Sequence, residues 1–388
     1  MPGLMRGVAV FIILLRCLMA AAPVFADEKA DAEKRRDIIR YGTDSEIAAL
    51  IGTLRAEKTG DFDGDLIDIA EGTNNNAILV ALFSFFADRE EAGLEKRALP
   101  LLENYSDTRN DVVLGAIDYL GKMKSADAAG VLAPILDGDS GPFTNAAIRA
   151  YGRIAATAGR DEAADYLITY YRERSPANET QREIVIALGE TGSKNATDFL
   201  VELIDNQEER YVLRMAALDA AAKIGDEAAK EAVVNAVLAN DPNVRSSAVG
   251  ALGAFDGDDV EKAILDAFRD SFFRTRLGAC AAAGKRKLAA AIPYLRYRAL
   301  NDEAAAVRDE AIKALGEIGS RAASAVLDEI FEGEKNPDRI RSLAAEMLVK
   351  QDPGTYTAKV TAAMEDAKKK NRAALASGLE RALAAGKS

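Results

Sequence analysis

The stretch from Val307 to Gly319 restricts the possible fold more than any other feature of this chain, because its pattern recurs. Apolar residues stand at positions 307, 311, 314, 315 and 318, the spacing that places one apolar stripe along one side of an α-helix. Gly319 then provides a helix stop, since glycine adopts a left-handed backbone without strain. The same pattern returns around Val244 and Leu213, and a pattern that returns at a fixed period predicts an array of similar units.

Nine copies of the pattern align on the position of Gly316, and by subtraction successive copies lie 29 to 37 residues apart. Each copy predicts two helices joined by a turn, and one such pair cannot bury its apolar faces alone, so neighbouring pairs must stack. We therefore predict an all-α fold, a right-handed α-solenoid of about nine two-helix repeats over residues 74–352. The aligned positions are Phe86, Gly121, Gly152, Gly189, Ala222, Gly253, Ala282, Gly316 and Val349.

Two predicted caps and a predicted signal flank this array. Residues 1–26 have the pattern of a secretory signal peptide, in which Arg6 precedes a short apolar core and small residues precede the cleavage site. An uncleaved anchor or a lipid on Cys17 is the alternative. We expect a cleaved, periplasmic or secreted protein with an N-terminal helical cap at 27–73 and a C-terminal helical cap at 353–388. No later stretch is apolar enough to cross a membrane, so we expect no stable membrane insertion after signal cleavage.

Composition excludes several kinds of chemistry. The chain contains no histidine, which removes Ser-His-Asp and Cys-His catalysis and every His-ligated metal site. Of the two cysteines, Cys17 falls in the predicted signal, and Cys280 stands among alanines, which predicts a small buried core residue. The formal net charge of −12 argues against nucleic acid as a partner. The acidic run at 61–68 resembles a calcium loop but lacks the required glycine and glutamate positions, so we expect no metal and no cofactor.

Asp241-Pro242-Asn243-Val244-Arg245, followed by Ala248 and Leu252-Gly253, resembles the second helix of a HEAT repeat, and the stretch from Val307 to Gly319 matches equally well. The short period, near 33 residues, resembles the subtype first recognised in phycobilisome lyases. The resemblance covers roughly residues 74–350. It implies a protein-binding scaffold, although a few proteins of this kind act as chromophore lyases.

An arginine follows the first apolar residue of the second helix in several copies. In HEAT arrays this arginine commonly forms a ladder with turn aspartates, and here Asp241 and Asp270 each stand four residues before an arginine. The resemblance therefore implies arginines paired to fix the geometry between repeats, and an anion-binding stripe is the alternative. The predicted ladder consists of Arg214, Arg245, Arg274, Arg308 and Arg341, whereas earlier copies have Val113, Thr144 and Gln181 at this position.

The segment 268–300 carries a local excess of positive charge. It holds eight basic residues and only Asp270 as an acid, and eight minus one gives +7 in an otherwise acidic chain. Aromatic residues alternate with these cations, which predicts a docking patch for an acidic partner; a solvated face that balances neighbouring acids is the alternative. Phe273 aligns with Val244 and is predicted to lie in the core. The candidate patch consists of Arg276, Lys285, Arg286, Lys287, Tyr294, Arg296, Tyr297 and Arg298.

A second candidate surface is the concave face, which the second helices usually line in HEAT solenoids. Small side chains at outward positions would let a partner helix approach closely, and a tight bend that requires small residues is the alternative. The candidate concave-face residues are Ser246, Ser247, Gly250 and Thr275.

These features favour an exported, non-catalytic scaffold that binds a protein partner along its concave face, aided by the basic patch at 269–298. An extended array without a deep pocket suits proteins or polymers better than small metabolites. The alternative is an envelope structural protein that binds an anionic polymer, either a glycan or a lipid headgroup. A lyase-type HEAT enzyme is the least favoured, because nothing in the sequence converges on a reaction.

Overall fold

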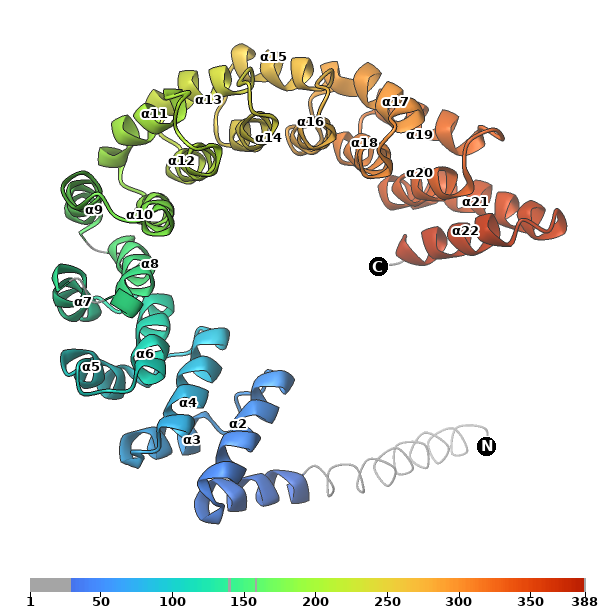
Figure 1. Ribbon diagram of the computed structural model, residues 1–388. Coiled ribbons are helices and arrows are strands. Elements are labelled where there is room, and N and C mark those ends of the chain that lie inside the picture. Colours follow the sequence, from blue (N-terminus) through green and yellow to red (C-terminus); the bar gives the residue numbers. More distant parts are fainter. Residues whose placement is uncertain (1–28, 139–140, 158, 387–388) are drawn as a thin grey trace, which may run out of the picture. The chain divides into compact units, whose positions relative to one another are not determined.

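The computed structural model describes residues 29–138, 141–157 and 159–386 (Figure 1). The chain consists of two compact units. The first unit is Met1–Gly159 and the second is Arg160–Ser388. The described residues form helices and turns and include no strand. None of the described helices is both long and apolar enough to cross a bilayer. The predicted signal at 1–26 lies outside the described residues.

Unit 1 starts with a helical segment at 29–41 and continues as alternating first and second helices. The helices α2, α4, α6 and α8 pack on one another in order, and α5 packs on both α6 and α7. The predicted boundary after residue 73 falls between α3 and α4, which are in contact. The bounds are α2 (Asp44–Glu57), α3 (Asp63–Gly72), α4 (Asn76–Arg89), α5 (Glu95–Glu103), α6 (Asn110–Met123), α7 (Ala128–Asp137) and α8 (Thr144–Ala155).

Large aromatic side chains fill the core of unit 1. Phe83, Phe85 and Phe86 on α4 are buried, and the ring of Phe83 lies 5.9 Å from that of Tyr119 on α6. Tyr119 is also buried, and its hydroxyl oxygen accepts a 2.9 Å hydrogen bond from the backbone N–H of Leu94. Burial raises the pKa of Tyr119, so this side chain remains neutral.

Unit 2 consists of two rows of helices. The second helices, α10 to α20, pack on one another in order, and Figure 1 shows them on the inner side of the arc of unit 2. The first helices form the outer row. Its members are α9 (Arg160–Arg174), α11 (Thr197–Asp205), α13 (Lys230–Ala236), α15 (Asp258–Ala267), α17 (Ile292–Asn301) and α19 (Arg321–Glu332). The inner row is α10 (Asn178–Thr191), α12 (Tyr211–Ile224), α14 (Pro242–Ala251), α16 (Phe273–Lys285), α18 (Ala305–Ile318) and α20 (Asp338–Gln351).

Two further helices follow the last aligned copy, where the sequence predicts helices. These are α21 (Pro353–Lys369) and α22 (Ala373–Ala385), and α22 packs against α20. Gly225 and Gly319 end α12 and α18 in the left-handed conformation, with φ of 64° and 63°, as the helix-stop pattern requires. The predicted all-α solenoid is confirmed.

Close contacts between glycine and alanine bring neighbouring second helices together in both units. A Cβ placed on Gly121 would lie 2.9 Å from the Cα of Ala150, and one on Gly189 would lie 2.8 Å from the Cα of Ala220. Such distances are too short for a methyl group, so only glycine permits this approach of the two backbones.

The structure corrects the alignment of one copy by two residues. Gly284, not Ala282, makes the close contact, because a Cβ on Gly284 would lie 2.8 Å from the Cα of Ala314. Asp270 accepts a 2.7 Å hydrogen bond from the backbone N–H of Phe272, and α16 begins only at the next residue. Phe273 is therefore 38% exposed, and its predicted place in the core is wrong.

Candidate binding site

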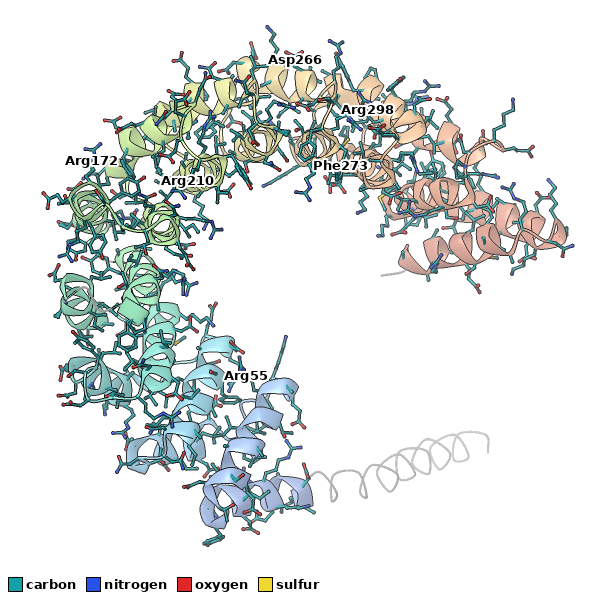
Figure 2. The ribbon with its side chains drawn as sticks, viewed as in Figure 1. Arg55, Arg172, Arg210, Asp266, Phe273 and Arg298 are labelled. Carbon is teal, nitrogen blue, oxygen red and sulfur yellow. The ribbon has the colours of Figure 1, made fainter. Side chains whose placement is uncertain are left out.

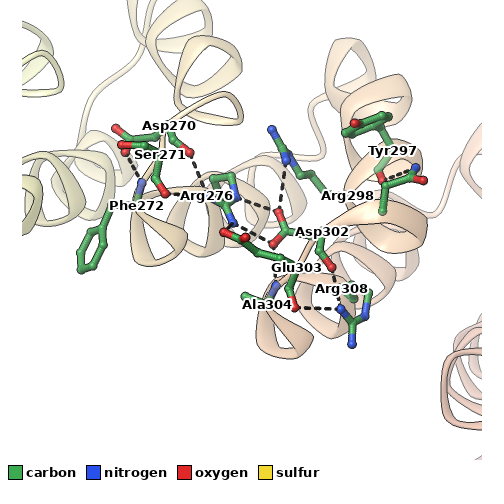
Figure 3. A network of polar contacts seen from close by, with 11 residues as sticks. Asp270, Ser271, Phe272, Arg276, Tyr297, Arg298, Asp302, Glu303, Ala304 and Arg308 are labelled. Carbon is green, nitrogen blue, oxygen red and sulfur yellow. Dashed lines mark hydrogen bonds and ion pairs between the residues drawn. The ribbon is translucent and has the colours of Figure 1, made fainter.

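Two ion pairs, one half-buried and one buried, connect consecutive repeats of unit 2, and we call them the ion-pair ladder. Arg245 donates to both carboxylate oxygens of Asp270, at 2.6 and 3.0 Å. Arg276 binds Asp302 in the same way, at 2.7 and 2.9 Å, and both residues are buried (Figure 3). In each pair the arginine belongs to one second helix and the aspartate to the turn of the following repeat, so the pair fixes the two repeats to one another.

The arginines also hold the turn that precedes their own helix. Nη1 of Arg276 donates to the carbonyl oxygens of Asp270 and Ser271, and Nη1 of Arg308 donates to those of Asp302 and Glu303 (Figure 3). These bonds satisfy carbonyl groups of the turn that would otherwise need water.

The predicted ladder needs two corrections. Arg276 occupies the rung assigned to Arg274, which instead is exposed and lies over the rings of Phe272 and Phe273. The carboxylate that binds Arg245 is Asp270, and not Asp241, which caps α14 by accepting from two backbone N–H groups. The shift arises because Asp241 directly precedes α14, whereas two residues separate Asp270 from the start of α16.

Arg214 and Arg341 are buried at the ladder position but have a different partner. Each donates from Nε to the carbonyl oxygen of the residue ten positions earlier, Ile204 at 3.0 Å and Phe331 at 2.8 Å. Burial lowers the pKa of Arg341, and the nearby Arg372 adds to this effect.

The ion-pair ladder shifts the protonation equilibria of its members. Burial opposes the charged form of Asp302, but hydrogen bonds from Arg276 and from the backbone N–H of Ala304 outweigh it, so the pKa of Asp302 lies below its usual value. The pKa of Asp270 is lowered for the same reasons, with Arg245 as the donor. The hydrogen bonds that Arg245 and Arg276 donate to these carboxylates raise the pKa of both arginines. All four side chains are therefore charged near neutral pH.

The predicted basic patch does not form one surface. Arg276 is 4% exposed and belongs to the ion-pair ladder. Arg286 donates to the carbonyl oxygen of Phe255 and pairs with Asp256 at 2.7 Å. Arg296 pairs with Glu329, with Nε donating at 2.8 Å. These partners lie far from their arginines in sequence, so composition alone overestimates the free charge.

Lys285 and Lys287 are exposed, and within the described part of the chain neither has a carboxylate at ion-pair distance. They share a shallow depression with Glu310 and Glu317, so their surroundings are close to neutral.

The remaining patch residues form a surface depression of about 430 Å³ that we call the arginine–tyrosine pocket. The guanidinium of Arg269 lies 5.5 Å from the centre of the Tyr294 ring, and that of Arg298 lies 5.3 Å from the centre of the Tyr297 ring. Arg298 reaches Asp302 at 3.3 Å, whereas the ring of Tyr297 turns away from the ion-pair ladder (Figure 3). The lining residues are Arg269, Pro293, Tyr294, Tyr297 and Arg298.

The lining of this pocket carries two positive charges and no acid. Tyr297 is 57% exposed, and Tyr294 packs against the buried ring of Phe268 with ring centres 5.4 Å apart. Arg298 lies with the outer helices and Phe273 with the inner ones (Figure 2), so the pocket faces away from the predicted concave surface. Arg269 was not among the candidate residues, although it is one of the eight basic residues counted in the segment 268–300, and that count is the signal that could have found it.

The predicted concave-face residues do not share one environment. Ser246 and Ser247 on α14 are half-buried, and Gly250 on the same helix is exposed. Thr275 is completely buried, and none of the described residues forms a hydrogen bond with its hydroxyl. Thr275 aligns with the core residues Val244 and Val307, so its assignment to a contact surface is wrong.

Two observations concern the thiol and the candidate metal ligands of the described residues. Cys280 is buried, as predicted, and burial raises the pKa of its thiol to about 12. The structure, as far as it is described, brings no group of three or more His, Cys, Asp or Glu side chains into a geometry that could hold a metal ion.

Comparison with known proteins identifies one family. Residues 39–388 match the model described as spirochaete HEAT repeat protein. No curated protein matches the chain.

Solved structures with a similar arrangement include three distant ones. The YibA protein of E. coli is 17% identical, covering 66% of this chain and 95% of that one, with a TM-score of 0.45. The complex of CpcE and CpcF of phycocyanin lyase from Nostoc is 19% identical, with 60% and 92% covered and a TM-score of 0.39. Kap121p is 12% identical, with a TM-score of 0.43, and the match covers 90% of this chain but 43% of that protein.

Proposed function

The chain belongs to the spirochaete HEAT repeat proteins, and from this premise we propose that it is an exported, non-catalytic scaffold that binds an acidic segment of a protein partner. The observation that carries the proposal is the arginine–tyrosine pocket, where Arg269 and Arg298 each lie over a tyrosine ring and no acid lines the depression. Arginine and tyrosine are among the residue types most enriched where protein interfaces gain their binding energy.

The chemistry of the pocket favours carboxylate groups on a polypeptide. Within the described part of the chain, no carboxylate lies within ion-pair distance of Arg269, so its planar guanidinium is available to bind one. The exposed ring of Tyr297 adds apolar area beside this charge. A segment with an acidic and an apolar side chain would contact both the guanidinium and the ring, whereas a sulfated or phosphorylated polymer would bind only the guanidinium.

Two sequence features support the remaining parts of the proposal. The pattern at 1–26 supports export, and the complete absence of histidine supports a role without acid–base catalysis near neutral pH. The proposed site lies on the outer helices of unit 2, while the concave surface favoured by the sequence loses Thr275 to the core.

A photocrosslinking experiment tests the binding site. Tyr297 is replaced by p-benzoylphenylalanine, and the protein is irradiated in its native cells. We expect a discrete adduct that protease digestion destroys, and a loss of this adduct when Arg269→Glu is added. Lys287→Glu is the matched control, because it makes the same charge change on an exposed residue outside the pocket.

Two outcomes would contradict the proposal. An adduct of equal yield in the Arg269→Glu variant would show that charge at the pocket is not used. A heterogeneous, protease-resistant adduct that disappears at high salt would instead support an anionic polymer, because salt screens exposed charges over about 8 Å at physiological ionic strength. Export has its own test: N-terminal sequencing of the mature chain is expected to begin at Asp27, and an intact Met1 would refute cleavage.

A further inference from the structure

The two pairs of the ion-pair ladder have sequence spacings of 25 and 26 residues, and the rung of Arg214 lacks such a carboxylate. Asp270 follows Arg245 by 25 residues and Asp302 follows Arg276 by 26, as subtraction of the residue numbers shows. The same spacing of 25 from Arg214 leads to Ala239, which has no side-chain acceptor. The carbonyl oxygen of Ala239 accepts from Nη1 of Arg245, just as the carbonyl oxygen of Asp270 accepts from Nη1 of Arg276. Ala239 therefore occupies the position of the ladder aspartates.

The guanidinium of Arg214 is buried and faces an open pocket. Arg214 is 7% exposed, and its hydrogen bond from Nε goes to the carbonyl oxygen of Ile204. In the described part of the chain no carboxylate lies within ion-pair distance of it. Arg214 and Ala239 both line a pocket of about 210 Å³. A buried positive charge without a counter-charge is energetically costly, and a planar guanidinium is best matched by a carboxylate.

We propose that this pocket binds one carboxylate group from outside the chain, in the place that Asp270 and Asp302 occupy in the next two rungs. The volume is below the range of about 300–1,000 Å³ that is usual for whole small-molecule ligands, so the pocket fits a single group and not a large metabolite. Side-chain amides of Gln207, Asn235 and Asn240 also line it and can donate hydrogen bonds to a bound oxygen.

The surroundings permit an anion to enter. Asp205 is the one acid in the lining, and it is exposed, so solvent screens its charge more than that of the buried Arg214. Leu238 at the rim is 82% exposed and offers apolar contact to whatever carries the carboxylate. This pocket shares no lining residue with the arginine–tyrosine pocket, so either site can fail without the other.

Ala239→Asp supplies the missing carboxylate within the chain and provides the sharpest test. The thermal midpoint of unit 2 is measured for the full chain at constant ionic strength, with sodium chloride replaced stepwise by sodium acetate. Capped Gly-Glu-Gly and Gly-Gln-Gly peptides are tested in parallel. Ala239→Asn is the control of equal size without the charge, and Arg214→Gln removes the binding group.

We expect acetate and the glutamate peptide to raise the midpoint of the parent chain and of Ala239→Asn. Ala239→Asp should start at a midpoint about 2–4 °C higher and no longer respond to either probe, because its own carboxylate fills the pocket. A larger effect of the glutamate peptide than of acetate would identify a protein side chain as the source, and equal effects a free carboxylate. Equal responses of the parent and Ala239→Asp, or a response to the glutamine peptide, would overturn the proposal.

Discussion

Unit 1 and the segment α14–α18 of unit 2 stabilise their repeats by different means. In unit 1, buried aromatic rings such as Phe86 and Tyr119 fill the space between helices. In α14–α18 the second helices carry smaller core residues, and the ion-pair ladder connects each repeat to the next through Asp270 and Asp302. One array can therefore combine apolar packing, which is non-directional, with charge pairs, which fix the register of adjacent repeats.

The two means of stabilisation respond differently to perturbation. Removing apolar volume leaves a cavity, and its cost depends on how far neighbouring side chains can move in. Removing one member of a buried ion pair leaves a charge without a partner, although the pair as a whole contributes little. The following predictions use this difference, from the largest expected effect to the smallest.

Phe86→Ala should have the largest effect, because the ring is fully buried in unit 1. We expect a loss of about 4 kcal/mol in the free energy of unfolding, from lost apolar transfer and the cavity left behind. Hydrogen exchange should show faster exchange in α4 and α6 while α14–α18 keep their protection. An equal loss of protection in α4–α6 and in α14–α18 would mean that the two units unfold together. It would contradict the difference in stabilisation between them.

Asp302→Ala should destabilise unit 2 by about 3 kcal/mol, because it removes the buried counter-charge of Arg276 and leaves only the exposed Glu303 beside it. The double variant Arg276→Met with Asp302→Leu should recover most of this loss, since it removes both charges. Denaturant unfolding of the three proteins measures the difference. Asp266→Ala, which changes an exposed acid on α15, is the matched control and should be near neutral. A double variant no better than the single one would contradict the assignment to charge.

Acid should weaken unit 2 before unit 1. The folded-state pKa values of Asp270 and Asp302 are lowered, so their stabilising contribution is present above the unfolded value of about 3.9 and is lost as pH falls through the folded values. Unit 1 has exposed pairs such as Arg55 with Asp88, which contribute less. Hydrogen exchange between about pH 5 and pH 2 should show the α14–α18 helices opening first. Changing both ladder aspartates to asparagine should remove this difference between the units.

Two glycine substitutions should have opposite, smaller effects. Gly284→Ala should cost about 2 kcal/mol, since the new methyl group would lie within 3.0 Å of Ala314 atoms. Gly250→Ala on α14 meets nothing within 4 Å and should stabilise by about 1 kcal/mol through helix propensity alone. Thermal unfolding of both variants checks the sign. A neutral Gly284→Ala would show that the helices can move apart at no cost.

The sequence predicted the helices well, but it predicted poorly which side chains pair between adjacent repeats. Apolar spacing and glycine stops are local signals, so α12 and α18 end where Gly225 and Gly319 require. The dipeptide Phe273-Arg274 imitates Val244-Arg245. However, α14 begins directly after Asp241, whereas two residues separate Asp270 from the start of α16, and the hydrogen bond from Phe272 to Asp270 shows where that helix begins. The sequence does not show which aspartates accept such a hydrogen bond, because every aspartate is followed, two residues later, by a residue that could donate one.

The candidate site shows the same limit. Charge counting found the excess of arginine at 268–300, yet Arg286 and Arg296 are bound by acids about 30 residues away. Tyr294, Tyr297 and Arg298 do share a pocket, which their spacing along one helix made accessible to prediction. Which charged side chains pair between adjacent repeats depends on how the repeats are aligned when they stack. Because the period varies from copy to copy, the sequence does not predict this alignment to within one residue.

The close glycine–alanine contacts affect how a chain of this kind can change in length. Gly121 and Ala150 are 29 residues apart, Gly189 and Ala220 are 31, and Gly284 and Ala314 are 30, by subtraction. Each interval is about one repeat, so a tandem duplication of one repeat copies one glycine and one alanine wherever its ends fall. The added unit then meets both neighbours through a contact that the gene already encodes, and evolution can lengthen or shorten such an array by whole repeats without inventing a new interface.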